Sequence, residues 1–218
     1  MTNQQIIQKT REYVEKEFSG EGTGHDWWHM YRVWKLSKRI AASEKEIDMF
    51  VVELGALLHD IADWKFHDGD IEAGPKAARH WLESLSVNDD IILVIEDIIR
   101  NVSFKGAKVK QNMTSKEGQI ISDADKLDAI GAIGIARAFA YGGANDRPIY
   151  EPNIKPVQHS TFDEYKNSKP HTINHFYEKL LLIKDKLYTK TAKDIANHRH
   201  QFIEQYLDEF YMEWEGEL

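Results

Sequence analysis

Cysteine is absent from this chain of 218 residues. Its absence excludes disulfide bonds and thiolate-bound metals, so only His, Asp, Glu and water are available to hold a metal ion. It is also compatible with a reducing cytoplasm. No apolar run approaches the ~18 residues of a membrane-spanning helix, and residues 1–5 lack the basic start and apolar stretch of a signal peptide. We therefore predict a soluble, cytoplasmic protein.

The chain also lacks an excess of positive charge. It has 36 acidic and 28 basic residues, and its formal net charge is −8. Duplex nucleic acids and anionic membranes bind basic surfaces, so we expect neither as a partner. A nucleotide remains a compatible ligand, because a metal ion and a few local cations can outweigh the global charge. A composition of 42% hydrophobic and 29% charged residues is typical of a folded globular protein.

Alternation of apolar and polar residues, the mark of a strand, is missing as well. Apolar residues recur instead at helical spacing, which predicts an all-α fold. Thr114 and Glu117 have the spacing of a capping box and predict a helix start. Four of the five prolines lie within 146–170, where we expect a long loop that acts as a lid or binding loop. The predicted helices span about 6–18, 25–42, 46–62, 73–85, 87–102, 114–143, 171–188 and 191–214.

Three short clusters hold residues suited to metal binding. They are His25-Asp26-Trp27-Trp28-His29, His59-Asp60 and Asp123-Ala124-Asp125-Lys126. The doublet His59-Asp60 ends an apolar helical run, and burial of that run would bury two ionisable groups that are rarely left unpaired. A metal ion satisfies a neighbouring imidazole and carboxylate. Several helices can share one ion, and four ligands would leave positions for water and substrate.

Other interpretations of these clusters stay open. His25 and His29 have the spacing of a zinc-protease helix, but Asp26 stands where that motif needs a longer Glu, and the glycines before His25 place it at a frayed helix end. A single helical histidine is commonly a hydrogen-bonded polar residue without a metal. Asp123, Asp125 and Asp128 are also compatible with a solvated helix face.

Taken in order, three motifs resemble the HD-domain metal-dependent phosphohydrolase superfamily. They are His29-Met30-Tyr31-Arg32-Val33, Leu57-Leu58-His59-Asp60 and Asp123-Ala124-Asp125-Lys126-Leu127. Further similarity, to the bacterial YpgQ/YedJ-like subgroup, lies around 175–180 and at Arg199-His200. The resemblance implies a single domain over 1–218. It would comprise an HD-domain helical bundle over about 25–140 and additional C-terminal helices, 171–214, that pack on it.

The resemblance also implies a metal site. Its ligands would be His29, His59, Asp60 and Asp125, holding one divalent ion, with manganese favoured over cobalt, nickel, iron, magnesium or zinc. Stringent-response hydrolases of the superfamily have an acid three residues after the doublet, where this chain has Asp63. Asp63 is thus a candidate base, although pairing with Lys65 explains it equally well. Members that bind two metals use histidines in the interval of His67 and His80; we favour one metal, with His67 approaching the substrate.

Several basic residues are candidates for binding phosphate, since phosphoryl oxygens need cations beside the metal. They are Arg32, Lys126, Arg137, His175 and Lys179, although Lys126 follows a ligand directly and should point elsewhere. Surface exposure is the competing interpretation for each. Asp128 lies three residues after Asp125 and is a second candidate for handling the proton of an attacking water. Trp27, Trp28, Trp64 and Tyr141 are candidates for stacking a base.

The implied activity is hydrolysis of nucleotides. We expect a phosphohydrolase that cleaves nucleoside or deoxynucleoside triphosphates to monophosphate and pyrophosphate. Its partner would be a phosphorylated small molecule, and the sequence leaves the oligomeric state open. The alternatives are a nucleotide phosphatase or phosphodiesterase, a mixed-valent di-iron oxygenase of the same superfamily, which requires a second metal, and a nucleotide-sensing module without turnover.

Overall fold

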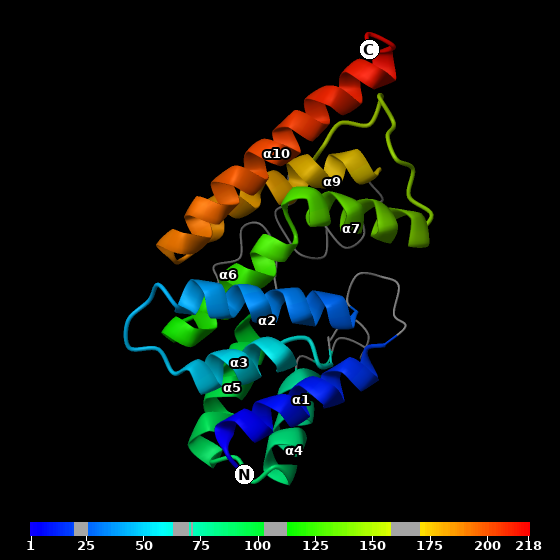
Figure 1. The fold of residues 1–218 in the computed structure, drawn as a ribbon. Coiled ribbons are helices and arrows are strands. Elements are labelled where there is room, and N and C mark those ends of the chain that lie inside the picture. The colour runs from blue at the N-terminus through cyan, green and yellow to red at the C-terminus, as the bar shows by residue number, and fades with distance from the viewer. Residues whose placement is uncertain (20–25, 63–69, 71, 103–112, 158–170) are drawn as a thin grey trace. The chain divides into compact units, whose positions relative to one another are not determined.

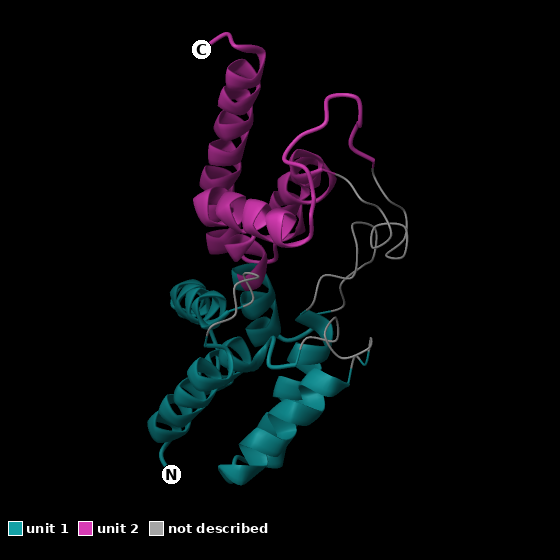
Figure 2. Cartoon of the chain, turned by 90° about the vertical axis from the view of Figure 1, so that its right-hand side faces the viewer, with its two compact units in different colours: residues 1–105, 110–124 teal, residues 106–109, 125–218 magenta. Residues whose placement is uncertain are grey.

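Helices make up every regular element in the part of the chain that the computed structural model describes (Figure 1). The described residues are 1–19, 26–62, 70, 72–102, 113–157 and 171–218. The predicted all-α fold is confirmed. Two compact units divide these residues, the first taking in those up to Ala124 and the second those from Asp125 to Leu218 (Figure 2). The single domain expected from the sequence stays a prediction.

The first unit is organised around helix α3. This helix is buried along most of its length, and Leu54, Leu57 and Leu58 are inaccessible to solvent. It packs against α1, α2 and α5. A helix surrounded by neighbours needs apolar residues on all faces, which is the pattern that its sequence has. The helices of this unit are α1 (Asn3–Glu17), α2 (Trp27–Ala41), α3 (Met49–Leu58), α4 (Ala73–Ser84), α5 (Asp89–Val102) and most of α6 (Lys116–Asp128).

Helices α3 and α6 approach closely, and this contact determines where the side chains one turn further along each helix point. A Cβ atom on Gly55 would lie 2.7 Å from Cδ1 of Ile121, so a larger residue at 55 would require the Ile121 side chain to move. His59 follows Gly55 by four residues, and Asp125 follows Ile121 by four. Residues four apart lie on the same face of a helix. The contact therefore explains why the end of α3 and the last turn of α6 present His59 and Asp125 to each other.

The start of α6 differs from the expected capping box. Ser115, rather than Thr114, caps the helix, because its Oγ accepts a hydrogen bond from the Gly118 backbone N–H at 3.1 Å. The Glu117 carboxylate accepts instead from the backbone N–H of Asp48 at 3.0 Å. Adjacent hydroxyl residues offer similar caps, and here the Glu117 carboxylate contacts Asp48 instead of the start of its own helix.

Two predicted helices are each divided in the structure. The expected helix 114–143 breaks after Asp128, and α7 begins at Gly131, whose φ of 79° is left-handed. The expected helix 171–188 is a short α-helix followed by a 3₁₀-helix. Neither division is marked by proline, and the helix stop that Gly131 offers lies in a series of small residues that are compatible with a continuing helix. The second unit contains α7 (Gly131–Ala144), α9 (Thr172–Glu178), the 3₁₀-helix η2 (Leu180–Lys186) and α10 (Lys190–Glu215).

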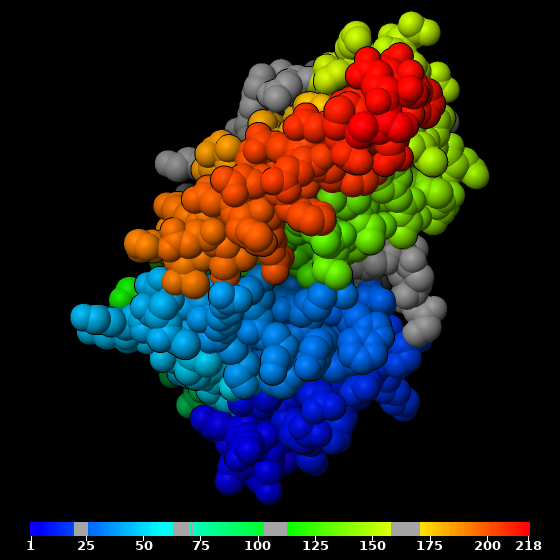
Figure 3. Space-filling model, turned by 45° about the horizontal axis from the view of Figure 1, so that its top comes forward, coloured from blue at the N-terminus to red at the C-terminus, as the bar shows by residue number. Residues whose placement is uncertain are grey.

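Aromatic rings join three described α-helices of the second unit. Phe139 of α7, Phe176 of α9 and Tyr206 of α10 lie with their ring centroids 5.8–6.1 Å apart, a separation typical of aromatic pairs. The long helix α10 packs obliquely against α7 (Figures 1 and 3). No described helix combines the length and the hydropathy needed to span a bilayer.

Candidate metal centre

His29 lies in the first turn of α2 and is completely buried. Asp26 is the N-cap of this helix, and its Oδ1 accepts a hydrogen bond from the His29 backbone N–H at 2.9 Å. Asp26 therefore fixes the backbone that carries His29, a role that the protease-like interpretation of the same motif overlooked. The signal was present in the sequence, because an Asp before an apolar helical run is a common N-cap.

His59 is the C-cap of α3 and is also buried. Its Nδ1 lies 2.8 Å from the carbonyl oxygen of Ala56, and since a carbonyl can only accept, Nδ1 carries the hydrogen. In the neutral ring, Nε2 then presents a lone pair. Metal-binding histidines are oriented by this same kind of hydrogen bond to the distal nitrogen. The Nε2 atoms of His29 and His59 are 3.2 Å apart.

Asp60 completes a compact group with the two histidines. Its Oδ2 is 3.7 Å from Nε2 of His29 and 3.9 Å from Nε2 of His59, with 11% of the side chain exposed. Two ligand atoms that each lie about 2.1 Å from one ion are about 3–4 Å from each other, depending on the angle between them. The three distances among His29, His59 and Asp60 have this size.

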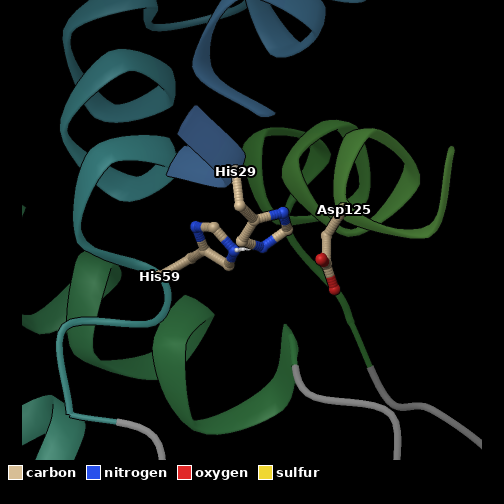
Figure 4. A group of neighbouring side chains, drawn as sticks. All are labelled: His29, His59 and Asp125. Carbon is tan, nitrogen blue, oxygen red and sulfur yellow. Dashed lines mark hydrogen bonds between the residues drawn. The ribbon is translucent and has the colours of Figure 1, made fainter. Parts of the chain in front are cut away.

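Asp125 lies in the last turn of α6, four residues after Ile121. Ligand atoms of His29, His59 and Asp125 all lie within 4.8 Å of one another, and they form a candidate metal site. Figure 4 shows the three side chains, each from a different helix end, pointing into the same space. Nitrogen and carboxylate donors without sulfur suit divalent ions of the first transition row and magnesium.

Two other predicted residues, Asp128 and Arg137, bind each other. Nη1 of Arg137 lies 2.8 Å from Oδ2 of Asp128, and the carboxylate is buried. The pair joins the end of α6 to α7. Lys126 is also buried, and its Nζ lies 4.9 Å from the centroid of the Tyr188 ring. Lys126 was expected to point away from the face of Asp125, and it does so by placing its charge over an aromatic ring, which stabilises it.

His175 and Lys179 lie one turn apart on α9, as expected from their spacing. Desolvation of the His175 ring, together with the positive charges of Lys179 and Arg147, lowers the pKa of His175 to about 3. The imidazole is therefore neutral near pH 7. Lys179 and Arg147 disfavour a positive charge on His175, and the same two cations favour the binding of an anion beside it. Arg147 was not among the residues singled out from the sequence, because it lies in the expected loop.

The structure describes only some of the remaining residues that the sequence singled out. Arg32 is half-buried on α2, one turn after His29. His80 is exposed on α4. The candidate base Asp63, the candidate substrate contact His67, and His25, Trp64 and Lys65 lie outside the described residues. Of the stacking candidates, Trp27 is buried, whereas Trp28 and Tyr141 are exposed.

Comparison with known proteins places these residues in a family. The HD domain family matches residues 27–130, which include the four predicted ligands. The Bacillus subtilis protein YpgQ is 34% identical over 201 residues, covering 92% of this chain and 89% of YpgQ. The chain belongs to the HD domain family. The resemblance recognised from its sequence motifs is confirmed.

Solved structures of three other proteins extend the similarity over nearly the whole chain. A Lactobacillus plantarum protein has a TM-score of 0.85 at 34% identity, covering 99% of both chains. A Bacillus thuringiensis protein described as an HD-superfamily hydrolase has a TM-score of 0.76 at 38% identity, covering 99% of this chain and 100% of that one. The crystal structure of YpgQ in complex with ADP has a TM-score of 0.75 at 31% identity, covering 96% and 98%.

Proposed function

We propose that this HD-domain protein is a metal-dependent phosphohydrolase that cleaves nucleoside or deoxynucleoside triphosphates to monophosphate and pyrophosphate. The convergence of His29, His59 and Asp125 carries this proposal. Two relatives support it. One is described as a hydrolase, which favours hydrolysis over a binding function. The other is YpgQ, whose complex with ADP favours a nucleotide as substrate.

In this proposal, one divalent ion is held by His29, His59, Asp60 and Asp125. Asp60 is included because its Oδ2 is within 4 Å of both imidazole Nε2 atoms. When bound, such an ion supplies a Lewis acid that activates water and polarises phosphoryl oxygens. Manganese is the favoured ion, and cobalt, nickel, iron, magnesium and zinc are the alternatives, because all accept this set of nitrogen and oxygen donors.

Two carboxylates, Asp63 and Asp128, are proposed to manage the proton of the attacking water, and we assign them different roles. Asp128 is paired with the Arg137 guanidinium at 2.8 Å. A carboxylate paired with a cation is a weak proton acceptor, so we assign to Asp128 the orientation of groups around Asp125. Asp63 is then the proposed base. It follows the doublet His59-Asp60 by three residues in the sequence, and it lies outside the described residues.

Basic side chains are proposed to bind the phosphates of the substrate. Arg32 follows His29 by one helical turn, so it suits the phosphoryl group that undergoes attack. His175 and Lys179 suit the other phosphates, because the neutral His175 ring can donate a hydrogen bond and Lys179 adds a charge. We also include His67, Lys126 and Arg137 as substrate-side residues. Of these, Lys126 and Arg137 are already engaged by Tyr188 and Asp128 and would act by shaping the site.

The test uses purified protein, Mn²⁺ and a panel of ribo- and deoxyribonucleoside triphosphates. We expect one pyrophosphate and one monophosphate for each triphosphate consumed, while release of inorganic phosphate would indicate a phosphatase instead. Asp60→Ala should lose bound Mn²⁺ and activity. Asp90→Ala, which removes an exposed carboxylate on α5, is the matched control and should retain both. Hydrolysis at the wild-type rate by Asp60→Ala would refute the assigned site.

Metal counting separates this proposal from the di-iron oxygenase. That activity needs a second metal, and the described histidine in the relevant interval, His80, is exposed on α4. We expect one equivalent of metal per chain after reconstitution. Two equivalents of iron, with oxygen consumption and no product from triphosphates, would favour the oxygenase.

A further inference from the structure

The last turn of α6 is fastened by a residue from α10. Nη1 of Arg199 donates a hydrogen bond to the backbone carbonyl oxygen of Leu127. This carbonyl belongs to the end of α6, where the last four carbonyls of a helix lack partners in the helix. The chain turns away at once, with Ile130 N–H also bonded to the Leu127 carbonyl at 3.2 Å. Arg199 therefore caps α6 from a distant part of the sequence.

The aliphatic stem of Arg199 also covers the junction between α6 and α7. A Cβ atom on Gly131 would lie 3.0 Å from Cγ and 3.1 Å from Cβ of Arg199. Gly131 has a φ of 79°, a conformation that favours glycine. The stem and the guanidinium of Arg199 thus hold both sides of the turn that follows α6.

We propose that Arg199 is a positioning residue that fixes the last turn of α6 and, through it, the carboxylate of Asp125. This inference rests on the proposed function, in which Asp125 is a metal ligand. Asp125 lies only two residues before Leu127, so fraying of this turn would move it directly. A guanidinium at a helix C-terminus also interacts favourably with the negative end of the helix dipole.

Two side chains next to Asp125 in this turn are also held by specific contacts. Asp128 is held by Arg137, and Lys126 by the ring of Tyr188. These contacts fix side chains on either side of Asp125, while Arg199 fixes the backbone. Loss of an outer partner of a metal ligand typically weakens metal binding by roughly 10–100-fold. We expect the removal of the Arg199 guanidinium to have an effect in this range.

Arg199→Met tests the proposal, because methionine keeps an unbranched stem over Gly131 and removes the donor. Arg39→Met is the matched control, since Arg39 is exposed on α2. Equilibrium dialysis with Mn²⁺ alone should show binding about tenfold weaker or worse in Arg199→Met and unchanged in Arg39→Met. Raising the Mn²⁺ concentration should restore activity of Arg199→Met toward the wild-type rate, because the weaker affinity then no longer limits occupancy of the site.

Hydrogen–deuterium exchange of the metal-free proteins gives a second readout. Peptides covering 120–131 should exchange faster in Arg199→Met, while those covering α3 should not change. Unchanged exchange over 120–131, or Mn²⁺ affinity equal to that of wild type, would overturn the role of Arg199. If Arg199→Met does not fold, Arg199→Leu, which also lacks the donor, takes its place under the same two criteria. If the wild-type protein binds no Mn²⁺, the proposed function fails, and the exchange experiment still judges whether Arg199 fastens α6.

Discussion

Both proposed histidine ligands are held by neighbours that the ligand pattern alone does not reveal. The Ala56 carbonyl sets which nitrogen of His59 carries its hydrogen, and the Asp26 carboxylate fixes the backbone of His29. Such contacts limit the rotation of the imidazoles before any ion arrives. A preorganised donor set pays less conformational entropy on binding an ion than a mobile one does.

At the residue scale, His175 makes a prediction about pH. Its pKa is lowered to about 3, whereas a histidine in an unfolded chain has a pKa near 6.5. Between these values the unfolded chain binds a proton that the native ring does not. Native stability therefore falls as the pH drops from 6.5 toward 3, by up to about 1.4 kcal/mol per pH unit.

The measurement is urea unfolding of wild type and His175→Gln at pH 7 and pH 5. Glutamine does not titrate, so the variant should lose less stability than wild type between the two pH values. The comparison uses the change with pH, because the substitution also alters packing at both. An equal loss in the two proteins would show that His175 titrates normally in the native state.

At the scale of elements, the candidate site is assembled from helix ends. His29 lies in the first turn of α2, His59 caps α3, and Asp125 lies in the last turn of α6. Helix ends leave backbone groups available for hydrogen bonds, and the turn that follows a helix affects the orientation of the side chains in its last turn. The conformation of the junction between α6 and α7 should therefore matter for stability as well as for the site.

Gly131→Ala and Gly143→Ala make a matched pair of substitutions in α7. At Gly131 the left-handed φ and the Arg199 stem both oppose a methyl group, so we expect a loss of about 1–2 kcal/mol. At Gly143 a Cβ would have no neighbour within 4 Å, so alanine should cost nothing or add up to about 1 kcal/mol. Chemical denaturation measures both, and equal losses would contradict the role assigned to the junction.

Sequence periodicity was sufficient to predict the helices and the central place of α3, because burial of apolar faces sets both. The same periodicity predicted that His59 and Asp60 lie near the end of a helix. It missed the break before Gly131, since glycines and alanines at 131–138 are compatible with a continuing helix. It could not identify Arg199 as a cap of α6, because contacts between residues distant in the sequence leave no local pattern.

At the scale of the whole molecule, metal binding and folding should be linked. The proposed ligands come from positions between 29 and 125, so an unfolded chain holds them far apart. A ligand that binds only the native state stabilises it by an amount set by its concentration and affinity, about 2.7 kcal/mol at one hundred times the dissociation constant. The ion should therefore raise the temperature of global unfolding.

Calorimetry with and without Mn²⁺ tests this linkage. For a chain of this size, each kcal/mol raises the Tm by about 2–4 °C, so saturating Mn²⁺ should raise it by roughly 5–11 °C. Asp125→Asn removes a proposed ligand and should abolish most of the increase, and a persistent increase would place the ion elsewhere. One transition that shifts as a whole would support the single domain expected from the sequence. Two transitions, with only one moved by Mn²⁺, would instead mean that the two compact units unfold independently.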